Sequence, residues 1–296
     1  MNATSPPPLA ALGDPRARFV WWLALAGLAC MYLPVYWAAA RGIWKSDDQA
    51  HGAIVLAVVL WLFWSLKEDI ATSEVQGSPV LGWTIFLSGL VAYVIGRTVG
   101  ISVLEFGSQS LVVAGLLVLT RGPQALHVAW FPIFYLLFMV PLPGIFVDAV
   151  TGPLKGWISS IVVNVLYAAG YPIARSGVTI MIGPYQMLVA DACSGLHSMF
   201  SLSALGMLFM YIMARRSVIH NAFMLASMLP ISFAANILRV MILVLVTYHL
   251  GDETGQGFLH GLAGMVLMLV ALASFFTLDI LLAAAFCKGS KISAAR

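Results

Sequence analysis

The chain has 296 residues, of which 61% are hydrophobic and only 9% are charged, and its mean hydropathy is +0.96. This composition is too apolar for a water-soluble protein, so it excludes soluble enzymes and predicts a protein that crosses a membrane several times. The net charge of +3 comes from Lys and Arg residues scattered through short loops, which argues against a nucleic-acid partner.

The N-terminal residues 1–18 are polar and rich in proline, and we expect a disordered cytoplasmic tail there. The next run, 19–40, is too long for a removable signal peptide and has no small-residue cleavage site. Because a helix needs about 20 apolar residues to cross a bilayer, the sequence predicts an all-α membrane domain over 19–287 with about eight spans. A short basic cytoplasmic tail, 288–296, follows it. The expected spans are 19–40, 51–66, 80–97, 101–120, 126–143, 195–214, 217–249 and 258–286.

Two further elements are expected between the fifth and sixth spans. Residues 145–170 are moderately apolar but carry several polar side chains, which is typical of an interfacial or re-entrant helix. The sequence leaves open whether this segment also crosses the membrane. Residues 177–190 contain two short β-prone runs around Gly183-Pro184, and they predict a small periplasmic hairpin that leads directly to Cys193.

The distribution of basic residues predicts the orientation, because Lys and Arg favour the cytoplasmic side of short loops. With the N-terminus inside and 145–170 not crossing, most basic residues lie inside, and Cys193 faces outward. The inner residues are then Arg16, Arg18, Lys67, Arg121, Arg215, Arg216, Lys288, Lys291 and Arg296, and the outer ones are Arg41, Lys45, Arg97, Lys155 and Arg175.

Three chemically able residues are expected at one membrane depth, near the outer interface. Cys193 lies in a small polar cluster between the hairpin and the sixth span. Arg239 lies far along the seventh span, with Asn236 on the same helical face at the i, i+3 spacing. His260 opens the last span. Each has a plainer reading: the thiol as apolar filler, the guanidinium as a headgroup anchor, and the imidazole as a partner for a loop carbonyl.

Together these residue types suit acyl transfer through a cysteine. A helix N-terminus or a nearby cation favours the reactive thiolate at Cys193, and Asp191 opposes this unless its side chain caps the helix. His260 suits the roles of base and then acid. Arg239 cannot act as a base at neutral pH, so we assign it to stabilising the thiolate or the oxyanion.

The order of these residues resembles the exosortase and archaeosortase family. The resemblance is carried by Ala192-Cys-Ser-Gly195 after a β-prone run, by Asn236-Ile-Leu-Arg239, by His260, and by the early segment Asp47-Asp-Gln-Ala-His-Gly52. The resemblance covers nearly the whole membrane domain, from about residue 20 to 286. Within the family, the chain resembles the exosortase B subgroup.

The resemblance implies a bacterial inner-membrane cysteine protease, or transpeptidase, that faces the periplasm. Such an enzyme recognises exported proteins with a PEP-CTERM tail, which is a Pro-Glu-Pro signal, one transmembrane helix and a basic cluster. It cleaves near the signal through a thioester, and the family is linked to exopolysaccharide production and surface sorting. The catalytic set carried over is Cys193, Arg239 and His260.

We expect the substrate to meet Ser194, Asn236, His51 and Arg175. His51 and Arg175 have an equally plain reading as interfacial polar residues. Glu105 is expected to pair with Arg97 in a structural ion pair.

Two rival functions remain at this stage. A transporter or polysaccharide-export component also has many spans with a few embedded polar groups, but it predicts polar residues throughout the bilayer depth. An intramembrane serine protease would use Ser194 with His260. No cofactor is expected, and a metal site is disfavoured because the histidines are dispersed.

Overall fold

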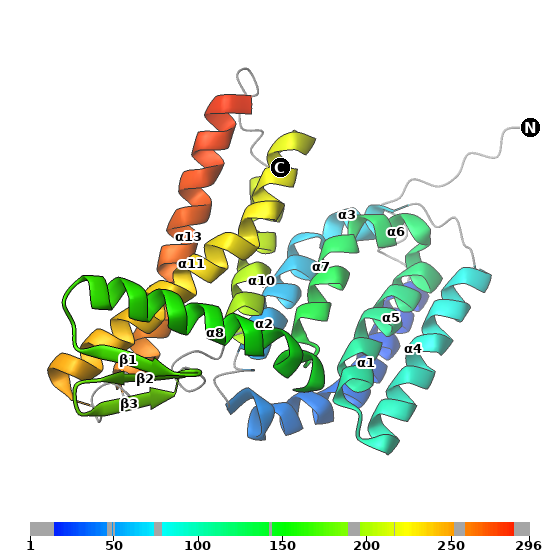
Figure 1. The fold of residues 1–296 in the computed structure, drawn as a ribbon. Coiled ribbons are helices and arrows are strands. Elements are labelled where there is room, and N and C mark those ends of the chain that lie inside the picture. The colour runs from blue at the N-terminus through cyan, green and yellow to red at the C-terminus, as the bar shows by residue number, and fades with distance from the viewer. Residues whose placement is uncertain are drawn as a thin grey trace, which may run out of the picture. The chain divides into compact units, whose positions relative to one another are not determined.

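The computed structural model describes residues 15–45, 49, 51–73, 79–141, 144–188, 196–215, 217–251 and 258–286. These residues form helices and one small antiparallel sheet, as Figure 1 shows. The chain divides into two compact units, Met1–Pro143 and Gly144–Arg296. All of the predicted catalytic residues belong to the second unit.

The regular elements in the described part of the first unit are all helices. They are α1 (Pro15–Arg41), η2 (Ile43–Lys45), α2 (His51–Ser65), α3 (Lys67–Thr72), α4 (Pro79–Val99), α5 (Ser102–Arg121), α6 (Pro123–Val128), α7 (Trp130–Tyr135) and η3 (Leu136–Met139).

The helices α4 and α5 pack backbone against backbone because glycines line their contact. A Cβ atom added at Gly89 would lie 2.8 Å from the backbone nitrogen of Val112. One added at Gly115 would lie 2.5 Å from the backbone nitrogen of Phe86. Apolar helices in a membrane gain little from hydrophobicity and associate through such close packing. The two spans predicted at 80–97 and 101–120 therefore form a tight helical hairpin.

Polar side chains connect α1 to α5 inside this unit. The hydroxyl of Tyr32 lies 2.8 Å from the hydroxyl of Ser108, and Tyr36 donates a 2.6 Å hydrogen bond to Oε1 of Gln109. At the end of the α4–α5 hairpin, Arg97 and Glu105 form the predicted ion pair with a 2.9 Å contact. Interhelical hydrogen bonds of this kind add to packing where hydrocarbon surrounds the helices.

The single helix expected over 126–143 is wrong. The chain forms α6, α7 and η3 in succession, with a break at Ala129. Pro132 has no N–H to donate to the carbonyl of Val128, so a continuous helix would lose a hydrogen bond at this point.

The described part of the second unit contains four helices and one sheet, and the sheet packs against α8 and α11. The elements are α8 (Gly144–Ala168), β1 (Ile173–Ser176), β2 (Thr179–Ile182), β3 (Tyr185–Leu188), α10 (Leu196–Met213), α11 (Val218–Leu250) and α13 (Phe258–Phe286). The helix at 144–168 confirms a helix near 145–170.

The sheet has one strand more than expected. The predicted hairpin is present as β2 and β3 around the Gly183-Pro184 turn, and Ile182 pairs with Tyr185. The strand β1 adds to the other edge of β2, with Ile173 opposite Ile182. The sequence hid this strand because its residues Ile-Ala-Arg-Ser lack the apolar alternation of a strand, and only the first is buried.

Two apolar clusters hold the second unit together, and both involve α11. The sheet-side cluster joins α11 to α8 and to the sheet. Its buried members are Ile158, Val162, Leu166, Ile173, Ile180, Ile182, Met187, Val240, Leu243 and Val244. The bundle-side cluster joins α11 to α10 and α13. Its buried members are Leu202, Phe209, Met224, Met228, Ala235, Leu267, Ala271 and Phe275.

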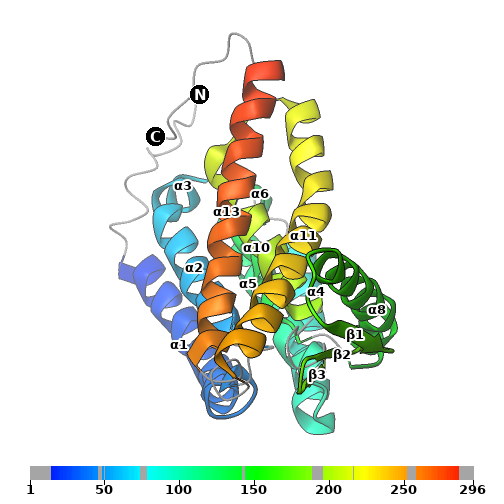
Figure 2. The ribbon, with the colours of Figure 1, turned by 60° about the vertical axis from the view of Figure 1, so that its left-hand side comes forward.

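The helix α11 has 33 residues and contains Pro230. It changes direction along its length in both Figure 1 and Figure 2, as expected where a proline removes a backbone hydrogen bond. The sequence predicts that a run of this length bends or projects from the bilayer.

Within the described residues, five helices are long and apolar enough to cross a membrane. They are Trp21–Arg41, Pro79–Val99, Ser102–Arg121, Val218–Leu250 and Val266–Ala285. His51–Ser65, Trp130–Met139 and Phe200–Met213 are shorter apolar helices. The chain is thus a helical, multi-pass membrane protein.

Candidate functional site

A buried polar face runs along α11. Asn236 has no exposed surface and Arg239 is 7% exposed. Ser232 and Thr247 are also fully buried. Because each helical residue turns by about 100°, these four positions lie on one side of the helix. The face is covered by protein along at least four turns.

The burial of Arg239 argues against the alternative that its guanidinium only anchors the helix to lipid headgroups. A guanidinium that anchors a helix to lipid headgroups extends outward to the membrane surface. Arg239 instead lies inside the second unit and interacts there. Asn236 shares this environment, so the predicted common face of the two residues is confirmed.

Arg239 and Asn236 lie between the two apolar clusters. Around the helix axis the order of side chains is Ala235, Arg239, Asn236 and Val240. Ala235 belongs to the bundle-side cluster and Val240 belongs to the sheet-side cluster. The two polar residues therefore occupy the seam where these clusters meet on α11.

Residues 189–195 connect β3 to α10 in the sequence. Met187 of β3 packs in the sheet-side cluster, and Leu202 of α10 packs in the bundle-side cluster. The predicted Cys193 and Ser194 belong to this connection and lie outside the described residues.

His260 lies two residues after the start of α13 at Phe258. Its backbone is helical, and its side chain is outside the described part. α13 packs along α11, and residues 251–257 join the two helices. Arg239 lies 11 residues before α11 ends at Leu250, which is about 16 Å of helix. Arg239 and His260 are thus on neighbouring helices. Arg239 lies about 16 Å of helix before the connection between them, whereas His260 lies close to it, near the start of α13.

Two other predicted contact residues lie on elements other than α11. Arg175 is exposed on β1, and its Nη1 donates a 3.4 Å hydrogen bond to the carbonyl of Gly156 in α8. His51 belongs to the first unit, where its Nε2 lies 3.3 Å from the carbonyl oxygen of Phe138.

A buried ionic cluster in the second unit escaped the sequence analysis. Arg215 donates from Nη2 to Oδ2 of Asp279 over 2.5 Å and from Nε to Oδ1 over 3.2 Å. Nε2 of His220 lies 2.9 Å from Oδ1 of the same carboxylate. Asp279 is the one charged residue in the α13 sequence. A single acid in an otherwise apolar helix usually indicates a buried carboxylate with a partner, so the sequence did carry a signal for this cluster.

An aromatic cluster at the end of α11 was also missed. The rings of Tyr171, Tyr248 and His249 pack edge to face, with centroid distances of 5.0 to 5.9 Å. Adjacent Tyr and His residues at the end of a long apolar helix gave a weak signal, since aromatic residues are common at membrane interfaces.

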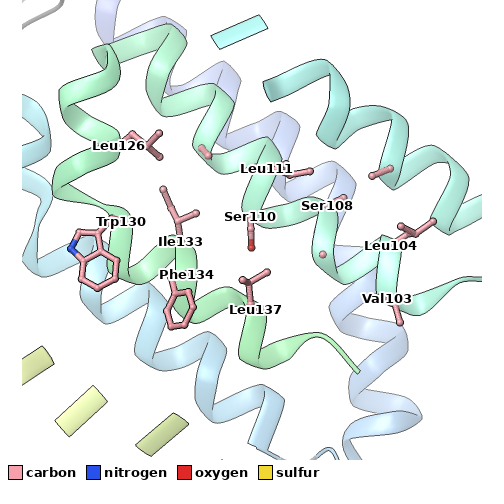
Figure 3. Close-up of a pocket in the computed structure, with 13 residues that line it drawn as sticks. Val103, Leu104, Ser108, Ser110, Leu111, Leu126, Trp130, Ile133, Phe134 and Leu137 are labelled. Atoms are coloured by element: carbon pink, nitrogen blue, oxygen red, sulfur yellow. The ribbon is translucent and has the colours of Figure 1, made fainter. Parts of the chain in front are cut away.

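The first unit has an open cavity of about 560 Å³, shown in Figure 3. Trp130, Phe134 and Leu137 form one wall and the α5 face around Gly107 and Ser110 forms the other. Its lining is apolar except for Ser108 and Ser110.

A family model described as transmembrane exosortase matches residues 43–277, a range that includes Cys193, Arg239 and His260. No curated protein and no solved structure matches the chain.

Proposed function

The chain belongs to the transmembrane exosortase family, and on that premise we propose that it is a membrane-embedded cysteine transpeptidase. It cleaves exported proteins near a PEP-CTERM sorting signal and passes them on through a thioester on Cys193. It works in a bacterial inner membrane, in a pathway of surface sorting linked to exopolysaccharide.

The observation that carries this proposal is the buried seam on α11. Arg239 and Asn236 are buried on α11 between residues of the sheet-side and bundle-side clusters. The chain must cross between the same clusters in the segment that contains Cys193, which follows Leu188 by five residues and precedes Leu196 by three. A connection this short keeps the thiol near both clusters, since five extended residues span at most about 18 Å.

The proposed reaction uses one residue for each task. His260 takes the proton of the Cys193 thiol, and the thiolate attacks the carbonyl carbon of the scissile peptide while the buried guanidinium of Arg239 stabilises the oxyanion that forms. The C–N bond then breaks, and His260 gives that proton to the leaving amine. A water or an amine nucleophile next attacks the thioester and gives a proton to His260. The C–S bond breaks, which releases the product, and that proton returns to the Cys193 sulfur.

The same proposal includes the finer topology. The five long helices make eight crossings together with His51–Ser65, Phe200–Met213 and the broken succession of α6, α7 and η3. The basic-residue distribution then puts the N-terminus and the C-terminus inside and the catalytic residues at the periplasmic face. Ser194, Asn236, His51 and Arg175 serve the substrate, with Asn236 best placed because it adjoins Arg239 in the seam.

A reporter assay tests the function. A PEP-CTERM reporter is co-expressed with the full-length chain, and its cleavage is followed by mass spectrometry in Cys193→Ala, Cys193→Ser, Arg239→Ala and His260→Ala. We expect processing to disappear in both Cys193 variants and to fall strongly in the other two.

The matched control is Cys30→Ala, which removes an exposed thiol from α1 and should leave processing unchanged. Normal processing by Cys193→Ala would rule out the thiol mechanism. Activity that survives in Cys193→Ser would favour the serine alternative. A wild-type chain that never cleaves the reporter would shift the assignment toward a transporter.

A further inference from the structure

The 560 Å³ cavity of the first unit lies beside the broken span. The helix expected over 126–143 is interrupted at Ala129 and ends as η3, so this stretch does not pack along α5 as one straight helix. α5 packs closely on α4 but makes few contacts with α7. A groove remains between α5 and α7, and Figure 3 shows the side chains on its two walls.

The groove is apolar and open on one side. Trp130 and Leu137 line it and are 56% and 45% exposed. On the α5 wall, a Cβ atom added at Gly107 would meet nothing within 4 Å. An apolar cavity does not hold water, and the bordering helices α4 and α5 are long and apolar enough to cross a membrane. The groove therefore takes up hydrocarbon from the bilayer.

The dimensions of the groove distinguish a lipid chain from a helix. Its lining residues on α5 run from Val103 to Ala114, a helical rise of about 16 Å. This length is close to one leaflet, which is half of a hydrocarbon core about 30 Å thick. The 560 Å³ volume divided by that length gives a mean cross-section of about 35 Å². A helix about 10 Å in diameter needs about 80 Å², so one extended acyl chain fits the groove better than a transmembrane helix does.

A cation lies at the end of α5 where the groove begins. Val103 follows the start of α5 at Ser102. Arg97 reaches the same end from α4, and its Nη1 donates a 2.9 Å hydrogen bond to Glu105. Its side chain is 49% exposed, so the remaining guanidinium donors are open to a phosphate. A lipid whose chain follows the groove brings its phosphate to this end.

We propose that the groove between α5 and α7 holds one acyl chain of a phospholipid, with the phosphate of that lipid at Arg97. The lipid fills the space that an unbroken span would fill with its own side chains. It is a structural ligand of the first unit, and the inference does not depend on the proposed function.

Native mass spectrometry of the full-length protein tests the proposal. The protein is reconstituted in phosphatidylglycerol nanodiscs and released into a mild detergent, and we expect the wild type to keep one phospholipid. Gly107→Phe places a ring in the groove, and it should lower the retained fraction about tenfold or more, because ring and chain cannot share the space. The matched control is Gly27→Phe on α1. An added Cβ atom there also meets nothing within 4 Å, so this variant should keep the lipid.

Equal retention by Gly107→Phe and Gly27→Phe, or a wild-type protein that keeps no lipid, would overturn the proposal. A dimer that Gly107→Phe alone dissociates would overturn it too, because a second copy of the chain would then fill the groove.

Photo-crosslinking gives a second measurement that needs no folded variant. Phosphatidylglycerol with a diazirine at the end of its acyl chain is activated in nanodiscs with the wild type, and the labelled peptides are mapped. We expect the strongest labelling around Ala114 and Leu126, at the deep end of the groove, and weaker labelling at Leu25, which is 49% exposed on α1. Labelling spread evenly over the exposed helix faces would contradict a bound lipid.

Discussion

Arg239 is a cation that the protein keeps away from lipid and water. Removing a guanidinium from water costs several kcal/mol, and only interactions inside the protein offset that cost. Its burial at 7% exposure on the same face as Asn236 is therefore hard to explain by membrane anchoring. A fixed positive charge is what a developing oxyanion requires, and this is the role that the proposed function gives to Arg239.

At this scale the first prediction concerns Arg239. Arg239→Ala should lower the rate of reporter cleavage about 10²- to 10³-fold, the usual effect of losing one oxyanion donor. Arg239→Lys should recover part of the rate, because it keeps the charge and loses the planar fork. The comparison variant is Arg97→Ala, whose side chain is 49% exposed and paired with Glu105. Equal losses in Arg97→Ala and Arg239→Ala would mean that the effect is not specific to the seam.

Sequence reasoning succeeded at Arg97 and Glu105 and missed the partners of Asp279. The first pair flanks a tight turn between two predicted helices, so their proximity follows from local connectivity. Asp279 meets Arg215 and His220, which are 64 and 59 residues away in the chain. Only the packing of α13 against α10 and α11 brings these three residues together. The spacing of residues along the chain does not predict that packing.

At the scale of elements, the Asp279 cluster fastens α13 to the start of α11. Asp279→Asn should lower the free energy of unfolding by about 3–5 kcal/mol, because it leaves the partly buried Arg215 without its counter-charge. Thermal unfolding in detergent measures the change, and exposed Glu68→Gln on α3 is the comparison. If Asp279→Asn had the melting temperature of the wild type, the stabilising role of the Asp279 cluster would be contradicted.

The glycine contact between α4 and α5 allows a matched pair of substitutions on one helix. Gly115→Ala should destabilise the hairpin by about 1–3 kcal/mol, since the added methyl group meets the backbone of Phe86. Gly107→Ala adds the same group into open space and should be neutral or slightly stabilising. Equal melting temperatures for the two variants would show that the helices are not packed this closely.

Elements were predictable where hydropathy alone defines them. The long spans at 80–97, 101–120 and 217–249 appear as α4, α5 and α11 with shifts of a few residues. Predictions failed where backbone chemistry decides, as at Pro132, where one expected helix becomes three pieces. They also failed for β1, which forms because β2 offers it an edge rather than because its own residues favour a strand.

At the scale of the whole molecule, one helix organises the second unit. α11 contacts the sheet and α8 on one side and α10 and α13 on the other, and its polar face lies between. The sequence predicted a shared membrane depth for Cys193, Arg239 and His260 from topology. It could not predict the seam, because the two clusters are assembled from segments far apart in the chain. Whether the thiol reaches this seam is the central claim.

Disulfide cross-linking tests that claim most directly. In a background with Cys30→Ala and Cys287→Ala, Cys193 is oxidised against a cysteine placed by Asn236→Cys or, on the opposite and partly exposed face of α11, by Leu238→Cys. A disulfide needs Cα atoms about 4.4–6.8 Å apart. The account predicts a rapid cross-link, seen by mass spectrometry, between Cys193 and position 236 and none with position 238. A cross-link with position 238 instead, or none with either while Cys193 remains open to alkylation, would contradict it.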